Sequence, residues 1–85
     1  MTYNVNLKYF ASIREDLGRG SEVLDTRAAS LGQLRDELIA RGDPWASALA
    51  RGKAVRLALN QVMSDESVLL APGSEVAFFP PVTGG

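Results

Sequence analysis

The chain has 85 residues, of which 46% are hydrophobic and 22% charged, with a formal net charge of -1. This length suits one domain with a small core, in which a deep substrate cavity would be hard to build. The sequence contains no cysteine and no histidine. Their absence excludes disulfides, thiolate chemistry and the usual zinc sites, and it removes the commonest general base. We therefore expect no metal site and no side-chain active site.

The distribution of charge and hydropathy excludes two further classes of protein. The basic residues are scattered rather than clustered, so we expect no nucleic-acid partner. No apolar stretch approaches the roughly 20 residues of a membrane span, and the first residues lack the charged and apolar regions of a signal peptide. The sequence predicts a cytoplasmic protein that contacts neither nucleic acid nor membrane.

Alternation of apolar and polar residues predicts several strands. It is clearest in residues 2–9, where Tyr3, Val5, Leu7 and Tyr9 share one face. Further extended segments are predicted over residues 21–26, 53–59, 62–63 and 75–79. Asn60-Gln61 and Pro72-Gly73 are predicted turns, with Gly73 at positive φ.

Helical spacing predicts a short helix over residues 11–17 and a longer one that begins after Ser30. Ser30 is a typical N-cap, and Gln33 three residues later predicts a capping box. Asp43 and Pro44 predict the cap and first position of a further helical turn. Residues 1–79 are thus expected to form an α+β domain of the β-grasp type, with a mixed sheet and one main helix packed on one face.

The last six residues, 80–85, are predicted to form an extended tail. Pro80 and Pro81 end the last strand because neither donates to a ladder, and their fixed φ keeps the backbone near polyproline II. Six extended residues reach roughly 20 Å. Gly84 and Gly85 carry no Cβ, so the end of this tail fits a narrow channel.

A terminal carboxylate has a chemical use that internal residues lack. Another enzyme can activate it as an acyl-adenylate, and a nucleophile can then replace AMP. Glycine leaves the carbonyl carbon uncrowded, so we expect Gly85 to be the reactive end of the chain. A terminal Gly-Gly arises by chance in roughly 1 chain in 200, but here it follows a stiff spacer on a small β-grasp domain.

Alternation in the last strand places Phe78 and Phe79 on opposite faces. We predict that Phe79 lies on the outward face and forms part of an apolar patch for a partner protein. Phe10 and Met63 are further candidates for this patch, with a position in the core as their alternative. Asp65-Glu66 is predicted to be a pair of solvated loop charges. Arg51-Gly52-Lys53 is predicted to be an exposed helix end, with contact to an acidic patch on a partner as the alternative.

Residues 78–85, Phe-Phe-Pro-Pro-Val-Thr-Gly-Gly, resemble the C-terminal signature of the small subunit of molybdopterin synthase, the MoaD family of ubiquitin-like sulfur carriers. The resemblance covers essentially the whole chain. It includes residues 7–11, the Leu59-Asn60-Gln61 hairpin and residues 72–77 before the signature.

This resemblance implies a sequence of reactions at the tail. A MoeB-like E1 activating enzyme would use MgATP to adenylate Gly85, and a sulfur donor would then convert it to a thiocarboxylate. The tail would enter the large subunit, MoaE, and pass its sulfur to cyclic pyranopterin monophosphate, which builds the dithiolene of molybdopterin. No trimming would be needed, because the sequence ends at Gly85.

The resemblance also implies the assembly. The synthase would be a heterotetramer of two large and two small subunits, with its catalytic side chains on the large subunit and no cofactor bound by this chain. Besides the reactive Gly84 and Gly85, the expected partner-binding residues are Phe79, Pro80, Pro81, Val82, Thr83, Phe10 and Met63.

Three other functions remain open. A related thiocarboxylate carrier could serve thiamine synthesis, although residues 80–83 favour the molybdopterin pathway. A ubiquitin-like modifier could use the same activated Gly85 to join lysines of target proteins. A plain interaction module would have an inert tail, so removal of Gly84 and Gly85 would leave its function intact. A stand-alone enzyme is least favoured, because the sequence offers no nucleophile–base pair.

Overall fold

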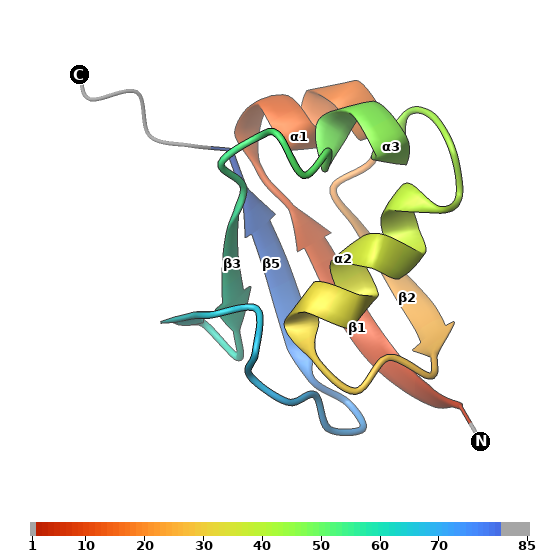
Figure 1. Ribbon diagram of the computed structural model, residues 1–85, viewed down its shortest axis with the longest axis vertical. Coiled ribbons are helices and arrows are strands. Elements are labelled where there is room, and N and C mark those ends of the chain that lie inside the picture. Colours follow the sequence, from red (N-terminus) through yellow and green to blue (C-terminus); the bar gives the residue numbers. More distant parts are fainter. Residues whose placement is uncertain (1, 81–85) are drawn as a thin grey trace.

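The computed structural model describes residues 2–80. In chain order, the elements are β1 (Tyr3–Tyr9), α1 (Ala11–Leu17), β2 (Ser21–Thr26), α2 (Leu31–Ile39), α3 (Trp45–Ala48), β3 (Arg56–Leu59), β4 (Val62–Ser64) and β5 (Glu75–Phe79). The predicted α+β fold of the β-grasp type is confirmed, with α2 as the main helix lying across the sheet (Figure 1).

One mixed sheet contains the strands in the order β2-β1-β5-β3-β4. The last strand, β5, therefore lies in the middle, parallel to β1 and antiparallel to β3. Because β1 and β5 are parallel, Tyr9 at the end of β1 pairs with Phe78 near the end of β5. Both strands point toward the end of the molecule at which α1 and α3 lie (Figure 1).

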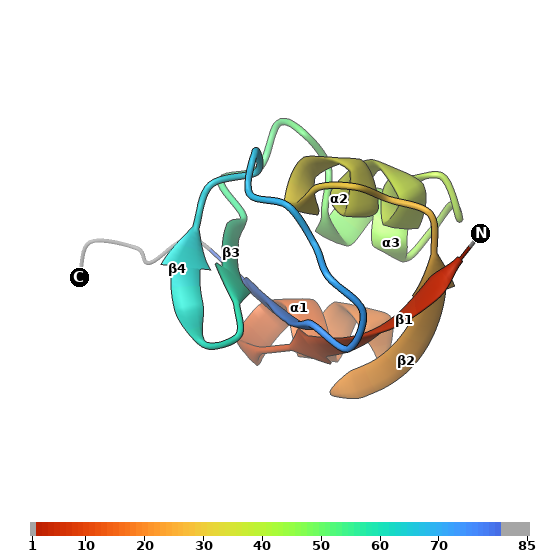
Figure 2. The same ribbon diagram turned by 90° about the horizontal axis from the view of Figure 1, so that it is seen from below.

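The core lies between the sheet and the helices. Helices α2 and α3 lie over one face of the sheet (Figure 2), and α1 packs against α3 and β5. The buried apolar residues are Val5, Leu7, Tyr9, Ile13, Leu17, Ala28, Leu31, Leu34, Leu38, Ala48, Leu49, Leu57, Val76 and Phe78. Each large aliphatic or aromatic side chain in this set contributes about 1.5–3 kcal/mol relative to an exposed position.

Two predicted helix starts differ from the structure in detail. The Ser30 hydroxyl accepts from the Gln33 backbone N–H at 3.2 Å, so the predicted N-cap is confirmed. The capping box is wrong, because the Gln33 side chain accepts from the Ala29 N–H at 2.8 Å rather than from Ser30. Helix α3 has Pro44 at its cap position, one residue later than predicted. Asp43 instead accepts a hydrogen bond from the Ser47 hydroxyl at 2.6 Å.

The hairpin turn between β3 and β4 matches its prediction. Asn60 and Gln61 have φ values of 50° and 70°, the left-handed conformations of a two-residue hairpin turn that follows the twist of the strands. Gly73 has the predicted positive φ, 81°. The strand predicted over 53–59 begins only at Arg56, which pairs with Phe79 at the end of β5. Before it, the Lys53 carbonyl accepts from the Val55 N–H at 2.9 Å and from a side chain of α2, so it is not part of a ladder.

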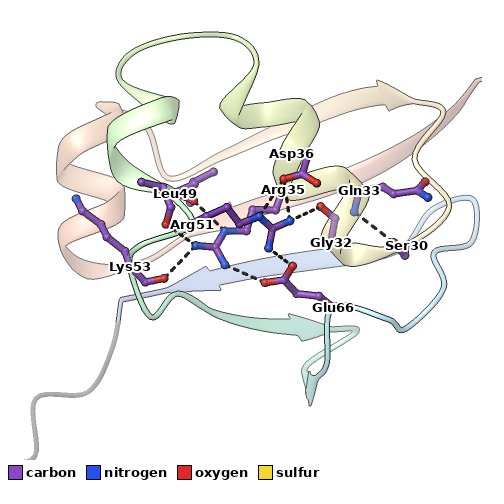
Figure 3. Close-up of polar contacts among 10 residues, drawn as sticks. Ser30, Gly32, Gln33, Arg35, Asp36, Leu49, Arg51, Lys53 and Glu66 are labelled. Atoms are coloured by element: carbon purple, nitrogen blue, oxygen red, sulfur yellow. Dashed lines mark hydrogen bonds and ion pairs between the residues drawn. The ribbon is translucent and has the colours of Figure 1, made fainter.

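Arg35 supplies the α2 side chain that donates to the Lys53 carbonyl. It is a buried arginine on the apolar side of α2 and is only 3% exposed. Its Nε donates to the Leu49 carbonyl at 2.8 Å. Its Nη2 donates to the carbonyls of Ala50 at 2.7 Å and Lys53 at 3.0 Å. Its Nη1 pairs with Glu66 Oε2 at 2.9 Å (Figure 3). A buried cation is tolerated when its donors are satisfied in this way.

Arg51 extends this network at the surface. Its Nη2 lies 2.8 Å from Asp36 Oδ1 and donates to the Gly32 carbonyl at 3.0 Å, and its Nη1 pairs with Glu66 (Figure 3). The prediction that Glu66 is a solvated loop charge was therefore wrong, whereas Arg51 is exposed, as predicted, and makes its ion pairs at the surface. Together the two arginines tie the segment after α3 to α2 and to the loop after β4.

The ion pairs of Glu66 predict a pH-dependent stability. The hydrogen bond from Arg51, aided by one from Arg35, lowers the pKa of Glu66 against the opposing effect of burial. A lowered folded-state pKa stabilises the fold above the ordinary value of 4.5, and this stabilisation is lost as the pH falls through the folded-state pKa. Glu66→Gln should therefore lower the free energy of unfolding at neutral pH by about 1 kcal/mol, with the difference from wild type shrinking in acid.

Urea denaturation across a pH series measures this difference. Asp65→Asn is the matched control, because Asp65 is exposed and makes no ion pair among residues 2–80. A Glu66→Gln deficit that stays constant down to acid pH would contradict the ion-pair explanation.

Candidate functional site

The predicted reactive end begins where β5 ends. Pro81, Val82, Thr83, Gly84 and Gly85 lie outside the described residues, and their predicted roles stay predictions. Residues 75–79 are described and are paired on both sides, with β1 and with β3. The point from which the tail starts is therefore fixed by the middle of the sheet.

Phe79, the last residue of β5, lies on the face of the sheet away from α2. Its ring stacks on that of Phe10, with 4.7 Å between centroids and 4° between planes. The Phe10 backbone N–H donates to the Phe78 carbonyl at 3.2 Å, which holds the start of α1 beside the end of β5. Ala11 then has a φ of 51°, a left-handed conformation that turns the chain from β1 into α1. The two aromatic rings thus form a stacked pair next to Pro80.

This pair borders an open hollow on the sheet face that carries no helix. Its apolar lining comes from Phe10, Met63 and Phe79. Its floor consists of Ala58 and Ala77, which are directly paired between β3 and β5. The two alanines are only 3% and 5% exposed, because the larger side chains around them cover them. Polar side chains also line the hollow: Lys8, Gln61 and Glu75.

For Phe10 and Met63, the sequence left open a second prediction, in which both side chains lie in the core. The structure places both on the open face, where they are 40% and 54% exposed. The core position next to Phe10 is taken by Tyr9, whose ring stacks on Phe78 with 5.6 Å between centroids. Burial, followed by a hydrogen bond to Glu22, raises the pKa of Tyr9, which therefore stays protonated. A partner-binding role for Phe10 and Met63 stays a prediction.

The sequence predicted the apolar residues that line the hollow but not its floor. Alternation gives the face on which Ala58 and Ala77 lie, but their position side by side depends on the pairing of β3 with β5. Each alternates with core residues, so each falls on the face opposite the core. Two small residues side by side on that face leave room between larger neighbours. Lys8, on the polar side of β1, reaches the same hollow.

The described residues offer no other obvious chemistry. In residues 2–80, no group of three or more acidic, cysteine or histidine side chains is placed to hold a metal ion. Across the same residues, no helix combines the length and the apolar character needed to cross a membrane. What the described residues present is a hollow on the open sheet face, beside the end of β5, with Phe10, Met63 and Phe79 as its apolar lining.

These features define a ubiquitin-like β-grasp protein. The sequence model of the ThiS family matches residues 7–85, and the chain therefore belongs to the ThiS family. It is 40% identical over 81 residues to the molybdopterin synthase sulfur carrier subunit of Haemophilus influenzae, which covers 95% of this chain and 99% of that protein. The resemblance to the MoaD family noted from the sequence is confirmed.

Solved structures show the same fold. SAMP1 from Haloferax volcanii superposes with a TM-score of 0.75 at 25% identity, covering 96% of this chain and 99% of that one. A chain from the protein–protein complex of subunits 1 and 2 of the molybdopterin-converting factor from Helicobacter pylori superposes with a TM-score of 0.62 at 26% identity, over 96% and 99% of the two chains.

Phe78 and Phe79 lie on opposite faces of the sheet, so replacing each in turn tests which face is buried and which is open. Phe78 is fully buried, so Phe78→Ala should cost about 3–5 kcal/mol, enough to unfold a domain of this size. Phe79→Ala should cost less than about 1.5 kcal/mol, because the lost stacking lies on the uncovered face. Thermal and urea unfolding measure both. Equal losses would mean that Phe79 belongs to the core.

Proposed function

We propose that this chain is the sulfur carrier subunit of a molybdopterin synthase. The observation that carries the proposal is its likeness to sulfur carrier subunits over 95% of its length. The family match supports it, because that match extends through Gly85 at the end of the tail. The described structure supports it with a central β5 that ends beside a hollow lined in part by Phe10, Met63 and Phe79.

The proposed chemistry takes place at the Gly85 carboxylate. An E1-like enzyme of the MoeB type uses MgATP to form the acyl-adenylate, and a sulfur donor displaces AMP to leave a thiocarboxylate. This chain then supplies the sulfur and the geometry of the tail, while the catalytic side chains belong to the large subunit. That division suits a chain with no cysteine and no histidine. MgATP is a substrate of the activating enzyme, and we place the reactions in the cytoplasm.

We propose that the open hollow contacts the large subunit. A protein interface gains most from apolar and aromatic side chains that a partner covers fully, and Phe10, Met63 and Phe79 provide them next to the tail. The Helicobacter pylori relative is a complex of subunit 1 with subunit 2, which supports a two-subunit assembly. We expect two large and two small subunits.

A protein modifier is the second candidate. SAMP1 from Haloferax volcanii, described as a small archaeal modifier protein, shares the fold. Its 25% identity is lower than the 40% identity of the Haemophilus influenzae sulfur carrier subunit. The thiamine carrier remains an alternative within the same chemistry, because the acceptor of the sulfur, not the activation of Gly85, distinguishes it.

Deletion of Gly85 tests the proposed reactive end. We expect the deleted chain to lose sulfur transfer entirely and to keep the stability of wild type, because Gly85 follows every strand among the described residues. Intact-protein mass spectrometry after incubation with MgATP, an activating enzyme and a sulfur donor should show oxygen replaced by sulfur in wild type alone. Product formation at the wild-type rate by the deleted chain would refute the role of Gly85.

A pair of surface variants tests the docking face. Met63 and Val23 are both exposed and both lie on the open face, but only Met63 lines the hollow beside Phe79. Met63→Asp should weaken binding to the large subunit at least tenfold, or about 1.4 kcal/mol, because it buries a charge in the interface. Val23→Asp should change it less than about threefold. Calorimetric titration measures both, and equal effects would place the interface elsewhere.

A further inference from the structure

The chain contains only two lysines, Lys8 and Lys53, among its nine basic residues. This matters for a protein whose carboxyl end is activated, because an acyl-adenylate is captured by a primary amine to give a stable amide. The guanidinium groups of the seven arginines stay protonated and are not nucleophiles. The positions of the two lysines therefore decide where the activated end of one copy could join the side chain of another.

Lys8 lies at the root of the tail. It is exposed, pairs with Ala77 across the parallel strands and lines the same hollow as Phe79. Lys53 lies in the segment between α3 and β3 and does not line the hollow. The two amines thus differ in one respect: Lys8 lines this hollow and Lys53 does not.

We propose that Lys8 is an acceptor site at which the activated Gly85 of a second copy forms an isopeptide bond. The inference rests on the activation of Gly85 proposed above. The incoming segment, Pro80-Pro81-Val82-Thr83, carries no charge and two rigid prolines, which suits it to an apolar hollow at low entropic cost. The hollow of the acceptor copy would hold this segment while Gly84 and Gly85 reach the amine.

The bond change balances without any redox partner. The unprotonated Lys8 amine attacks the Gly85 carbonyl carbon of the acyl-adenylate, and a C–N bond forms. The bond from that carbon to the phosphate oxygen breaks, AMP leaves with the electron pair, and the amine proton passes to solvent. MgATP, which the activating enzyme consumes, supplies the driving force.

The position of Lys8 makes this reaction compete with sulfur transfer. A partner protein that covers the hollow also covers Lys8, since both belong to one face. Conjugation is therefore restricted to carriers whose open face is free, and a bound large subunit protects its carrier against it. Whether this face is free or covered then determines whether the activated carrier undergoes conjugation at Lys8 or sulfur transfer.

The test is to incubate the full chain with MgATP and the activating enzyme, without a sulfur donor. We expect a species with the mass of two chains less one water, and a branched peptide in its digest that carries the Gly-Gly end on Lys8. Lys53→Arg should form it at the wild-type level. Lys8→Arg should lose at least nine-tenths of it, measured per AMP released so that any change in activation is removed. Excess large subunit should suppress it in wild type.

Each other result overturns the proposal. Conjugate that maps to Lys53, or that persists in Lys8→Arg, assigns the acceptor wrongly. Wild-type chains that gain sulfur when the donor is added, but form no conjugate without it, keep the proposed function and refute the acceptor site. Chains that give neither product refute the activation of Gly85 and the acceptor site together.

Discussion

The last strand, β5, is held along both edges, by parallel pairing with β1 and antiparallel pairing with β3. A strand in the middle of a sheet is the part of a small domain that frays least, because its backbone groups are satisfied on both sides. The segment that directly precedes Pro80 is therefore held on both sides, and a partner that binds the sheet face beside it would contact the chain next to the end of β5.

The network of Arg35 supports this arrangement from the other side of the sheet. It fixes the carbonyls of Leu49, Ala50 and Lys53, which precede β3. Arg56 at the start of β3 in turn pairs with Phe79. A buried cation is costly when any of its donors lacks a partner, so any other path of the segment before β3 would leave Arg35 unsatisfied. The network therefore selects one path for this segment more than it adds to the stability of the fold. That path determines how β3, and with it Ala58, lies beside β5.

The features that short stretches of sequence determine were predicted correctly. Alternation predicted that Phe79 lies on the face opposite Phe78, Ser30 predicted the N-cap of α2, and Pro72-Gly73 predicted the turn before β5. The pairing of Arg35 with Glu66 was missed, because 31 residues separate them and neither has a neighbour that requires the other. The visible signal was Arg35 itself, a charge four residues after Leu31 on the apolar face of α2. The floor of Ala58 and Ala77 depends on strand order, which no local pattern contains.

In the proposed function, a chain without cysteine or histidine serves sulfur chemistry because its functional group is the Gly85 carboxylate, which an activating enzyme converts. The structure places Phe79 both at the end of β5 and in the lining of the hollow that we propose as the docking face. One carboxylate can be held by one partner at a time, so the proposed activating enzyme and large subunit would act on it in succession. The free carrier between them is the state in which the activated end and the exposed amine of Lys8 can meet.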